Sequence, residues 1–305
     1  MNHIISTKQF LDKHILSDLF SLADQMEQRD RERKLVKTLD GRVLACIFYE
    51  PSTRTRFSFE SAMLKLGGTT ITTENATQFS SVTKGETLHD TITVISQYAD
   101  VIVLRHYEEG SAKIASEVSS VPVINAGDGT GEHPTQALLD LYTIQKEFGR
   151  VDNLKIALVG DLLYGRTIHS LLNLLALYKG IELYMVAPEQ LKLPTRYKEN
   201  LTENNIKFHE LKDLHDVAGL ANVIYMTRVQ RERFSDKEEY EKLKDCYIIN
   251  NDMMKTLQKD AIILHPLPRV SEISVEVDID KRAAYFRQTR NGLYIRMALL
   301  ENIVK

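Results

Sequence analysis

The feature that most constrains the fold of this 305-residue chain is a repeated alternation of short apolar runs with longer amphipathic stretches. The runs are rich in Val and Ile, and the stretches between them space their apolar residues as a helix does. This rhythm is typical of βαβ units, in which parallel strands are joined by helices that cover the sheet. We expect strands at residues 43–48, 101–104, 121–124, 156–159, 183–186, 223–226 and 261–264.

The length suggests two domains, because one domain takes roughly 150 residues. No Pro/Gly-rich linker divides the chain, so we place the boundary after the Gly-rich segment 127–131, just before a helix that begins near Thr135. We therefore expect an α/β fold of two domains, residues 1–133 and 134–289, each a mostly parallel sheet flanked by helices. The clearest helical patterns cover residues 53–66, 135–148, 167–178 and 293–304. The polar stretches 69–85 and 228–240 are expected to be loops.

Composition and charge exclude several classes of protein. The longest apolar run, Val43 to Tyr49, has seven residues, whereas a membrane-spanning helix needs about 20. The net charge of −3 gives no electrostatic footprint for nucleic acid or for an anionic membrane. The first residues lack the pattern of a secretion signal, so we expect a cytoplasmic protein. Cys46 and Cys246 lie far apart in the sequence, and we expect two buried structural thiols.

Ligands of open α/β sheets bind beyond the carboxyl ends of the strands, where helix N-termini also point their N–H groups. Ser52, Thr53, Arg54 and Thr55 follow the first predicted strand. Ser52 can cap a helix whose first turn then offers backbone donors, hydroxyl groups and an arginine to a phosphate. The spacing alone is equally compatible with a plain Ser N-cap beside surface arginines.

Polar residues also follow the next two predicted strands. Arg105 comes directly after residues 101–104, and His133 and Gln136 lie three apart at a predicted helix start, where they could face one site. Taken singly, a histidine or glutamine is more often a structural hydrogen-bonding residue. The sequence has neither a His-x-x-x-His pair nor a Cys/His cluster, so no metal site is expected.

The segment Gly160 to Thr167 nearly matches the P-loop pattern, with Arg166 in place of the usual Lys. A P-loop needs that compact Lys charge, and a companion strand should end in an Asp that holds Mg²⁺. The strands at 223–226 and 261–264 instead lead into Thr227-Arg228 and His265-Pro266. We therefore do not expect nucleoside triphosphate binding, and Arg166 is better suited to a carboxylate.

Candidate ligand-binding residues also follow the last two predicted strands. Arg228 and Gln230 follow one strand, and two prolines restrict the backbone of the loop at 265–269, which could aim its carbonyl groups at a ligand amine. A rigid turn without function also explains that loop taken alone. No nucleophile and base stand out as a pair, so catalysis would depend on positioning and charge stabilisation.

Four ordered motifs resemble those of the carbamoyltransferases, and the likeness runs nearly from end to end of the chain. Ornithine-specific members typically carry His-Cys-Leu-Pro where this chain has His265-Pro266-Leu267-Pro268, so it most resembles the aspartate-specific catalytic chains. The motifs are Ser52-Thr53-Arg54-Thr55-Arg56, His133-Pro134-Thr135-Gln136, Gly160-Asp161 with Tyr164-Gly165-Arg166-Thr167, and His265-Pro266-Leu267-Pro268-Arg269.

The resemblance implies a carbamoyl-phosphate domain at 1–133, with helix 290–305 packing back on it, an aspartate domain at 134–289, and an active site in the cleft between them. The phosphate ligands it implies are Ser52, Thr53, Arg54, Thr55 and Arg105, with His133 and Gln136 around the carbamoyl group. It implies Arg166, Arg228 and Gln230 as aspartate ligands, with Leu267 and Pro268 contacting the substrates through the backbone. Ser80 and Lys84 would reach in from a neighbouring subunit of a homotrimer.

The implied reaction joins carbamoyl phosphate to the α-amine of L-aspartate, as in pyrimidine biosynthesis, and requires no cofactor or metal. Thr55, Arg105 and His133 would stabilise the oxyanion, and the departing phosphate can take the proton of the amine. Two anionic substrates also account for cations at Arg54, Lys84, Arg105, Arg166 and Arg228 in a chain of net charge −3.

This chain departs from the usual family pattern at three places. It has Gly131-Glu132 where Asn-Gln is usual, Leu163 where Lys is frequent and Ser271 where Asp is frequent. None of these removes an implied substrate ligand. Some relatives bind separate regulatory chains, and the last two departures bear on whether this chain shares such behaviour. The alternatives are a carbamoyltransferase for another amino acid, such as ornithine, and a non-catalytic anion or amino-acid sensor.

Overall fold

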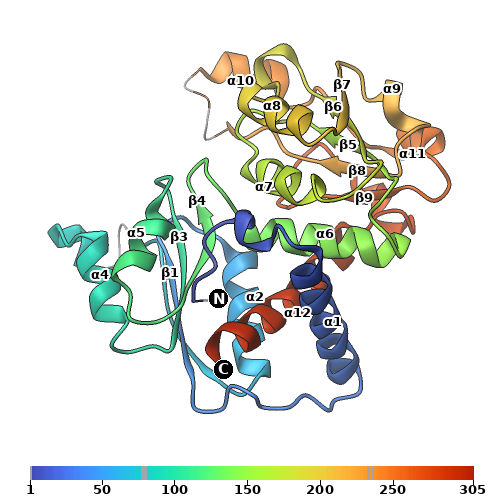
Figure 1. The fold of residues 1–305 in the computed structure, drawn as a ribbon. Helices are drawn as coiled ribbons and strands as arrows, with labels where there is room; N and C mark the ends of the chain where they lie inside the picture. Colours follow the sequence, from blue (N-terminus) through green and yellow to red (C-terminus); the bar gives the residue numbers. More distant parts are fainter. Residues whose placement is uncertain (1, 77–80, 232–233, 235) are drawn as a thin grey trace. The chain divides into compact units, whose positions relative to one another are not determined.

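The computed structural model describes residues 2–76, 81–231, 234 and 236–305. The chain forms two compact units (Figure 1). Residues 1–142 and 290–305 make up the first, and residues 143–289 the second. The division thus falls within helix α6 (Pro134–Phe148), after Tyr142, and not at the start of that helix as the Gly-rich segment predicts.

The first unit is built on a fully parallel sheet of four strands in the order β2-β1-β3-β4. Helix α2 packs on β1 and β2, and α5 packs on β3 and β4. The unit also contains the short 3₁₀ helices η1 (Thr7–Phe10) and η2 (Ser81–Lys84). Its strands are β1 (Val43–Phe48), β2 (Thr69–Glu74), β3 (Val101–His106) and β4 (Val123–Asp128). Its helices are α1 (Lys13–Arg31), α2 (Thr53–Lys65), α4 (Leu88–Ile95), α5 (Ser111–Val118) and the first part of α6.

The second unit carries a fully parallel sheet of five strands in the order β7-β6-β5-β8-β9. Helix α12 (Tyr285–Val304) begins in this unit and continues into the first. The strands are β5 (Lys155–Val159), β6 (Glu182–Val186), β7 (Lys207–Leu211), β8 (Val223–Met226) and β9 (Ile262–Leu264). The helices are α7 (Arg166–Leu175), η3 (Glu189–Leu191), α8 (Thr195–Glu203), α9 (His215–Ala218), α10 (Lys237–Leu243), α11 (Asn251–Thr256) and η5 (Val275–Ile279).

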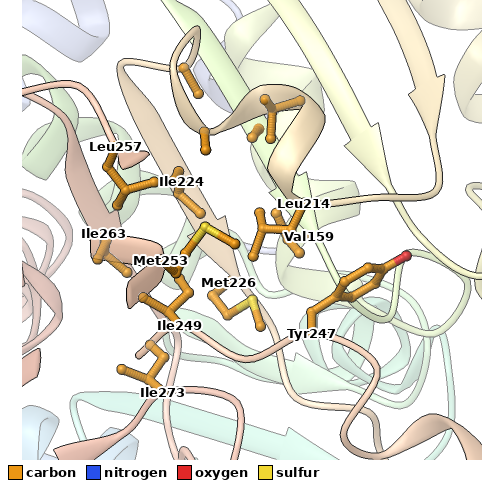
Figure 2. Close-up of a cluster of buried hydrophobic side chains, with 14 of the residues drawn as sticks. Val159, Leu214, Ile224, Met226, Tyr247, Ile249, Met253, Leu257, Ile263 and Ile273 are labelled. Carbon is orange, nitrogen blue, oxygen red and sulfur yellow. The ribbon is translucent and has the colours of Figure 1, made fainter. Parts of the chain in front are cut away.

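Side chains from both the sheet and its covering helices fill the core of the second unit. Figure 2 shows Ile224 and Met226 of β8 beside Ile263 of β9, with Met253 of α11 packed against them. These side chains are 5% exposed or less, so the strands are covered by apolar contacts and cannot shift in register without exposing them.

All seven expected strands are present, but two strands were missed. Residues 69–74 and 207–211 form β2 and β7, each of which is one of the two edge strands of its sheet. An edge strand need not be apolar, and the Thr-rich sequence of β2 suits an extended backbone. The expectation that all of 69–85 is a loop is therefore wrong for 69–74 and for η2. Likewise, α10 occupies part of the stretch expected as a loop at 228–240.

Two further expectations concern the thiols and the membrane. Both cysteines are free, and Cys46 is buried as expected, whereas Cys246 is exposed, contrary to the expectation. Cys246 follows α10 at the surface, outside the apolar runs that make up the core. Among the described residues, none of the helices combines the length and the apolar character needed to cross a bilayer.

Candidate active site

The strand order of the first sheet reverses between β1 and β3, and ligands of open parallel sheets bind at such switch points. Ser52 lies at the N-cap of α2, directly after β1. Arg105 is paired in register with Phe48, the last residue of β1. The carboxyl ends of these two strands therefore bring the segment 52–55 and Arg105 to the same edge.

The start of α2 is held by a carboxylate that the sequence analysis did not single out. Glu74, the last residue of β2, accepts a hydrogen bond from the Ser52 N–H (3.2 Å) and lies 3.2 Å from the guanidinium of Arg56. The expected Ser52 cap does not form. Ser52 has ψ 80°, and its hydroxyl accepts no hydrogen bond from an N–H group of the first turn of α2. Of the segment, Thr55 is buried, Ser52 is half-buried, and Thr53 and Arg54 are exposed.

Arg105 lies within β3 rather than after it, and its guanidinium is held from two sides. It lies 3.2 Å from a carboxylate oxygen of Glu50, and its Nη1 donates to the carbonyl of Ala126 at 3.2 Å. Glu50 is a second acidic residue that the sequence analysis missed, although its place just after an apolar strand was a usable signal. The pair orients the Arg105 charge at the edge of the sheet.

His133 and Gln136 lie together at the start of α6, as expected. Both are buried, and the carbonyl of His133 accepts from the N–H groups of Gln136 (3.0 Å) and Ala137 (3.2 Å). The side-chain amide of Gln136 donates to Asp140 at 2.8 Å. Asp140 is fully buried and was not among the candidates.

The departure at Glu132 has a local explanation. Its carboxylate accepts from the Ser6 hydroxyl (2.5 Å), the Thr7 N–H (2.7 Å) and the Thr7 hydroxyl (2.6 Å). A carboxylate can accept all three bonds, whereas the single amide oxygen usual in the family has fewer acceptor positions. Glu132, the residue before His133, thereby holds the N-terminal segment against the start of α6.

Lys84 is the last residue of η2 and is exposed. Ser80, the other residue assigned to a neighbouring subunit, lies outside the described residues. The structure therefore gives a position for only one of these two candidates.

The second sheet has its own switch point, between β5 and β8. The loops that follow these strands touch: Gly160 has φ +107°, and a Cβ there would lie 2.4 Å from the carbonyl oxygen of Thr227. The Asp161 N–H donates to the Thr227 hydroxyl at 3.0 Å. Only glycine fits this approach, so the near-match to a P-loop reflects packing between two loops.

Asp161 positions Gln230, one of the three residues expected to meet a carboxylate ligand. It is fully buried and accepts from the Tyr164 N–H (2.9 Å) and from the side-chain amide of Gln230 (3.3 Å). Burial raises the pKa of Asp161, and these hydrogen bonds oppose that rise. Arg166 begins α7 and Arg228 follows β8, and both are half-buried. The switch point therefore carries Arg166, Arg228 and Gln230 on adjoining loops.

The loop after β9 is fixed by a buried pair. Nε2 of His265 lies 2.7 Å from Glu272, while Nδ1 accepts from the Leu267 N–H at 2.7 Å, so the ring proton is on Nε2 and is donated to the carboxylate. Leu267 takes a left-handed conformation (φ +51°), and the peptide bond to Pro268 is cis. The Leu267 N–H is thus used inside the loop.

The ionised form of Glu272 is stabilised by its hydrogen bonds. Burial alone would raise its pKa, but the hydrogen bonds from His265 and from the Val270 N–H outweigh burial and hold the pKa below its ordinary value. Among the described residues, no group of three or more His, Cys, Asp or Glu side chains is placed to hold a metal ion.

Comparison with known families matches both units. The model "Aspartate/ornithine carbamoyltransferase, carbamoyl-P binding domain" covers residues 2–146, and the model for the Asp/Orn binding domain of the same family covers residues 152–303. The chain belongs to the aspartate/ornithine carbamoyltransferase family. The junction of these two carbamoyltransferase domains falls at the end of α6 or just after it, close to the division between the compact units.

Relatives within the carbamoyltransferase family match over nearly the whole chain. The chloroplastic aspartate carbamoyltransferase of Arabidopsis thaliana is 52% identical over 302 residues, covering 99% of this chain and 77% of that protein. The catalytic subunit from Methanocaldococcus jannaschii is 51% identical over 305 residues, covering 100% and 98%. Aspartate transcarbamoylase from Trypanosoma cruzi, solved with carbamoyl phosphate and aspartate, has a TM-score of 0.93 at 39% identity, covering 99% and 96%.

The His265–Glu272 pair predicts a pH-dependent loss of stability. Because the pKa of Glu272 lies below its ordinary value of 4.5, the ionised carboxylate stabilises the fold above that pH, and this contribution disappears as the pH falls through the lowered pKa. We expect Glu272→Gln to cost about 1–3 kcal/mol in the free energy of unfolding at pH 7 and clearly less at pH 3.5. Urea unfolding at both pH values measures this difference.

Glu276→Gln is the matched control, because Glu276 is exposed and makes one hydrogen bond, to the Asn251 N–H. It should change the free energy of unfolding by less than about 0.5 kcal/mol at either pH. Equal costs for the two variants at pH 7 would contradict the role given to the buried pair.

Proposed function

We propose that this chain transfers the carbamoyl group of carbamoyl phosphate to the α-amine of L-aspartate, releasing N-carbamoyl-L-aspartate and phosphate. The observation that carries the proposal is the grouping of anion-binding side chains at the switch points of two parallel sheets, in a chain whose relatives are aspartate carbamoyltransferases. The relative from T. cruzi was solved with both substrates.

The first unit would hold carbamoyl phosphate. The start of α2 presents backbone donors and the positive end of the helix dipole, which suit a phosphate. Arg105, oriented by Glu50, lies at the same edge of the sheet. His133 and Gln136, both buried, would bind the carbamoyl group. The proposed phosphate ligands are Ser52, Thr53, Arg54, Thr55 and Arg105.

The second unit would hold aspartate. Arg166 and Arg228 offer two guanidinium groups for two carboxylates, and Gln230 is held beside them by Asp161. Because the Leu267 N–H is used by His265, the backbone carbonyl groups of that loop are what it can offer to a ligand amine, with Pro268 next in the chain. The α-carboxylate and the side-chain carboxylate of aspartate account for the need for both arginines.

The reaction needs charge stabilisation more than a dedicated base. The neutral amine attacks the carbamoyl carbon, and the oxygen of that carbon gains negative charge, which Thr55, Arg105 and His133 would stabilise. The C–O bond to phosphate then breaks, and the leaving phosphate takes the proton of the amine. This scheme assigns no step to a cofactor.

The proposal extends to assembly and location. Lys84 is exposed on η2, and α2 and β2 leave Phe57, Leu64 and Ile71 exposed, as expected for a surface that another subunit covers. We propose a homotrimer in which Lys84 and Ser80 complete the site of a neighbour. The cytoplasmic location stays a prediction from the sequence, and the Arabidopsis relative is named as chloroplastic.

The activity is tested by measuring phosphate release from carbamoyl phosphate with aspartate, with ornithine and with no amine. We expect release and a carbamoylated product with aspartate, because two carboxylates match Arg166 and Arg228, and only the background rate in the other two reactions. Turnover with ornithine but not with aspartate would contradict the proposal and identify ornithine as the substrate. Binding without turnover in all three reactions would favour the sensor alternative.

The shared site is tested by mixing Arg54→Ala and Lys84→Ala chains. Each variant alone should be nearly inactive, since each lacks one charge that the phosphate needs. After unfolding, mixing and reassembly, about one quarter of the interfaces in a cyclic trimer should pair an intact Arg54 with an intact Lys84. Activity near that fraction of wild type, with each variant refolded alone as the control, supports the trimer. Mixtures as inactive as their parents would contradict it.

A further inference from the structure

The orientation of the Gln136 side chain follows from its partner. A carboxylate only accepts hydrogen bonds, so the atom that faces Asp140 at 2.8 Å is the amide nitrogen, and Oε1 points the other way. Both residues are buried, Gln136 at 8% exposure and Asp140 at 0%. Within the described part of the chain, Oε1 of Gln136 accepts no hydrogen bond. The fold therefore presents an acceptor, not a donor, at this position.

The negative charge of Asp140 acts on a buried arginine. Arg296 of α12 is 4% exposed, its Nη1 donates to the Ser58 hydroxyl at 2.8 Å, and its guanidinium lies 5.1 Å from the centre of the Phe59 ring. Burial lowers the pKa of Arg296 to about 10, and the negative charge of Asp140 opposes that fall, so the arginine is still charged at pH 7. A buried cation needs a nearby anion, and Asp140 supplies it.

We propose that Asp140 is a positioning residue that fixes the Gln136 amide so that its oxygen selects the NH₂ group of the carbamoyl donor. This inference rests on the proposed function, since it assumes that the carbamoyl group binds beside Gln136. It assigns a task to a buried acidic residue that contacts no substrate in the proposed mechanism.

The fixed Gln136 oxygen lets the site discriminate between carbamoyl phosphate and acetyl phosphate, which have nearly the same shape. The carbamoyl NH₂ donates to the fixed oxygen, whereas a methyl group at that place leaves a buried acceptor without a partner. The expected preference is on the order of tenfold or more in affinity. A glutamine free to rotate would adapt to either group and would select less.

Asp140→Asn tests the role with a change of nearly equal size. Asn offers one oxygen in place of two, and the buried Arg296 charge claims it, so the new NH₂ faces Gln136 and forces the glutamine amide to turn round. The readout is the ratio of two dissociation constants measured by calorimetry. The ligands are phosphonoacetamide and acetonylphosphonate, which differ only in NH₂ against CH₃.

Wild type should prefer phosphonoacetamide by about tenfold, and Asp140→Asn should reduce this ratio to about threefold or less. A merely structural role would weaken both ligands alike and keep the ratio. The matched control is Tyr142→Phe, which removes another polar contact of α6, the 2.6 Å bond from Tyr142 to Asp24, and should keep the wild-type ratio. A folded Asp140→Asn protein with the wild-type ratio overturns the proposal.

A second variant covers the case in which Asp140→Asn does not fold. Replacing both charges, in Asp140→Leu with Arg296→Met, leaves no buried ion without a partner, and such replacements are often tolerated. Gln136 then loses its acceptor, so the ratio should again fall to about threefold or less, and an unchanged ratio overturns the proposal. If wild type binds neither ligand, the proposed function has failed, which differs from a wild-type preference that survives in the variants.

Discussion

The structure depends on one constraint of parallel sheets: the strand order reverses once in each, between β1 and β3 and between β5 and β8. At such a point the connections leave in opposite directions, so the carboxyl ends of two neighbouring strands stay open to a ligand. The buried apolar strands hold these ends rigidly, which lets loops and helix starts carry the polar groups without moving them. Each unit thereby has one place suited to a small anion, and the chain has two anionic substrates to bind.

Carboxylates orient the proposed ligands at both places. Each carboxylate accepts a hydrogen bond or ion pair from one side of its partner residue. The groups on the other side of that residue then point in a fixed direction toward a ligand. This explains how a chain of net charge −3 can present positive and hydrogen-bonding groups in fixed directions. It also explains why acidic residues that contact no substrate in the proposed mechanism lie buried or half-buried near the candidate site. The pairs are Glu50 with Arg105, Glu74 with Ser52 and Arg56, Asp140 with Gln136, Asp161 with Gln230, and Glu272 with His265.

The sequence predicted the parts of this arrangement that local patterns encode. The apolar runs located the strands that line both switch points, and the residues after them located Arg105, His133 and Arg166. The edge strands β2 and β7 were missed because a strand paired on one side needs no apolar run. Glu74, Asp140 and Glu272 were missed because a carboxylate reveals its partner only once the chain is folded. The failed Ser52 cap has the same origin, since the conformation of that residue is set by the distant Glu74.

The central claim, that the edge beyond β1 and β3 binds the phosphate of the carbamoyl donor, is tested most directly by calorimetric titration with phosphonoacetamide. Arg54→Ala should weaken binding at least tenfold, because a charge-assisted contact to phosphate is lost. Arg42→Ala is the matched control: Arg42 lies just before β1, at the opposite end of that strand, and pairs with Asp100 at 2.8 Å. The account predicts an affinity within about twofold of wild type for this variant. Equal affinities for wild type and Arg54→Ala would contradict the account.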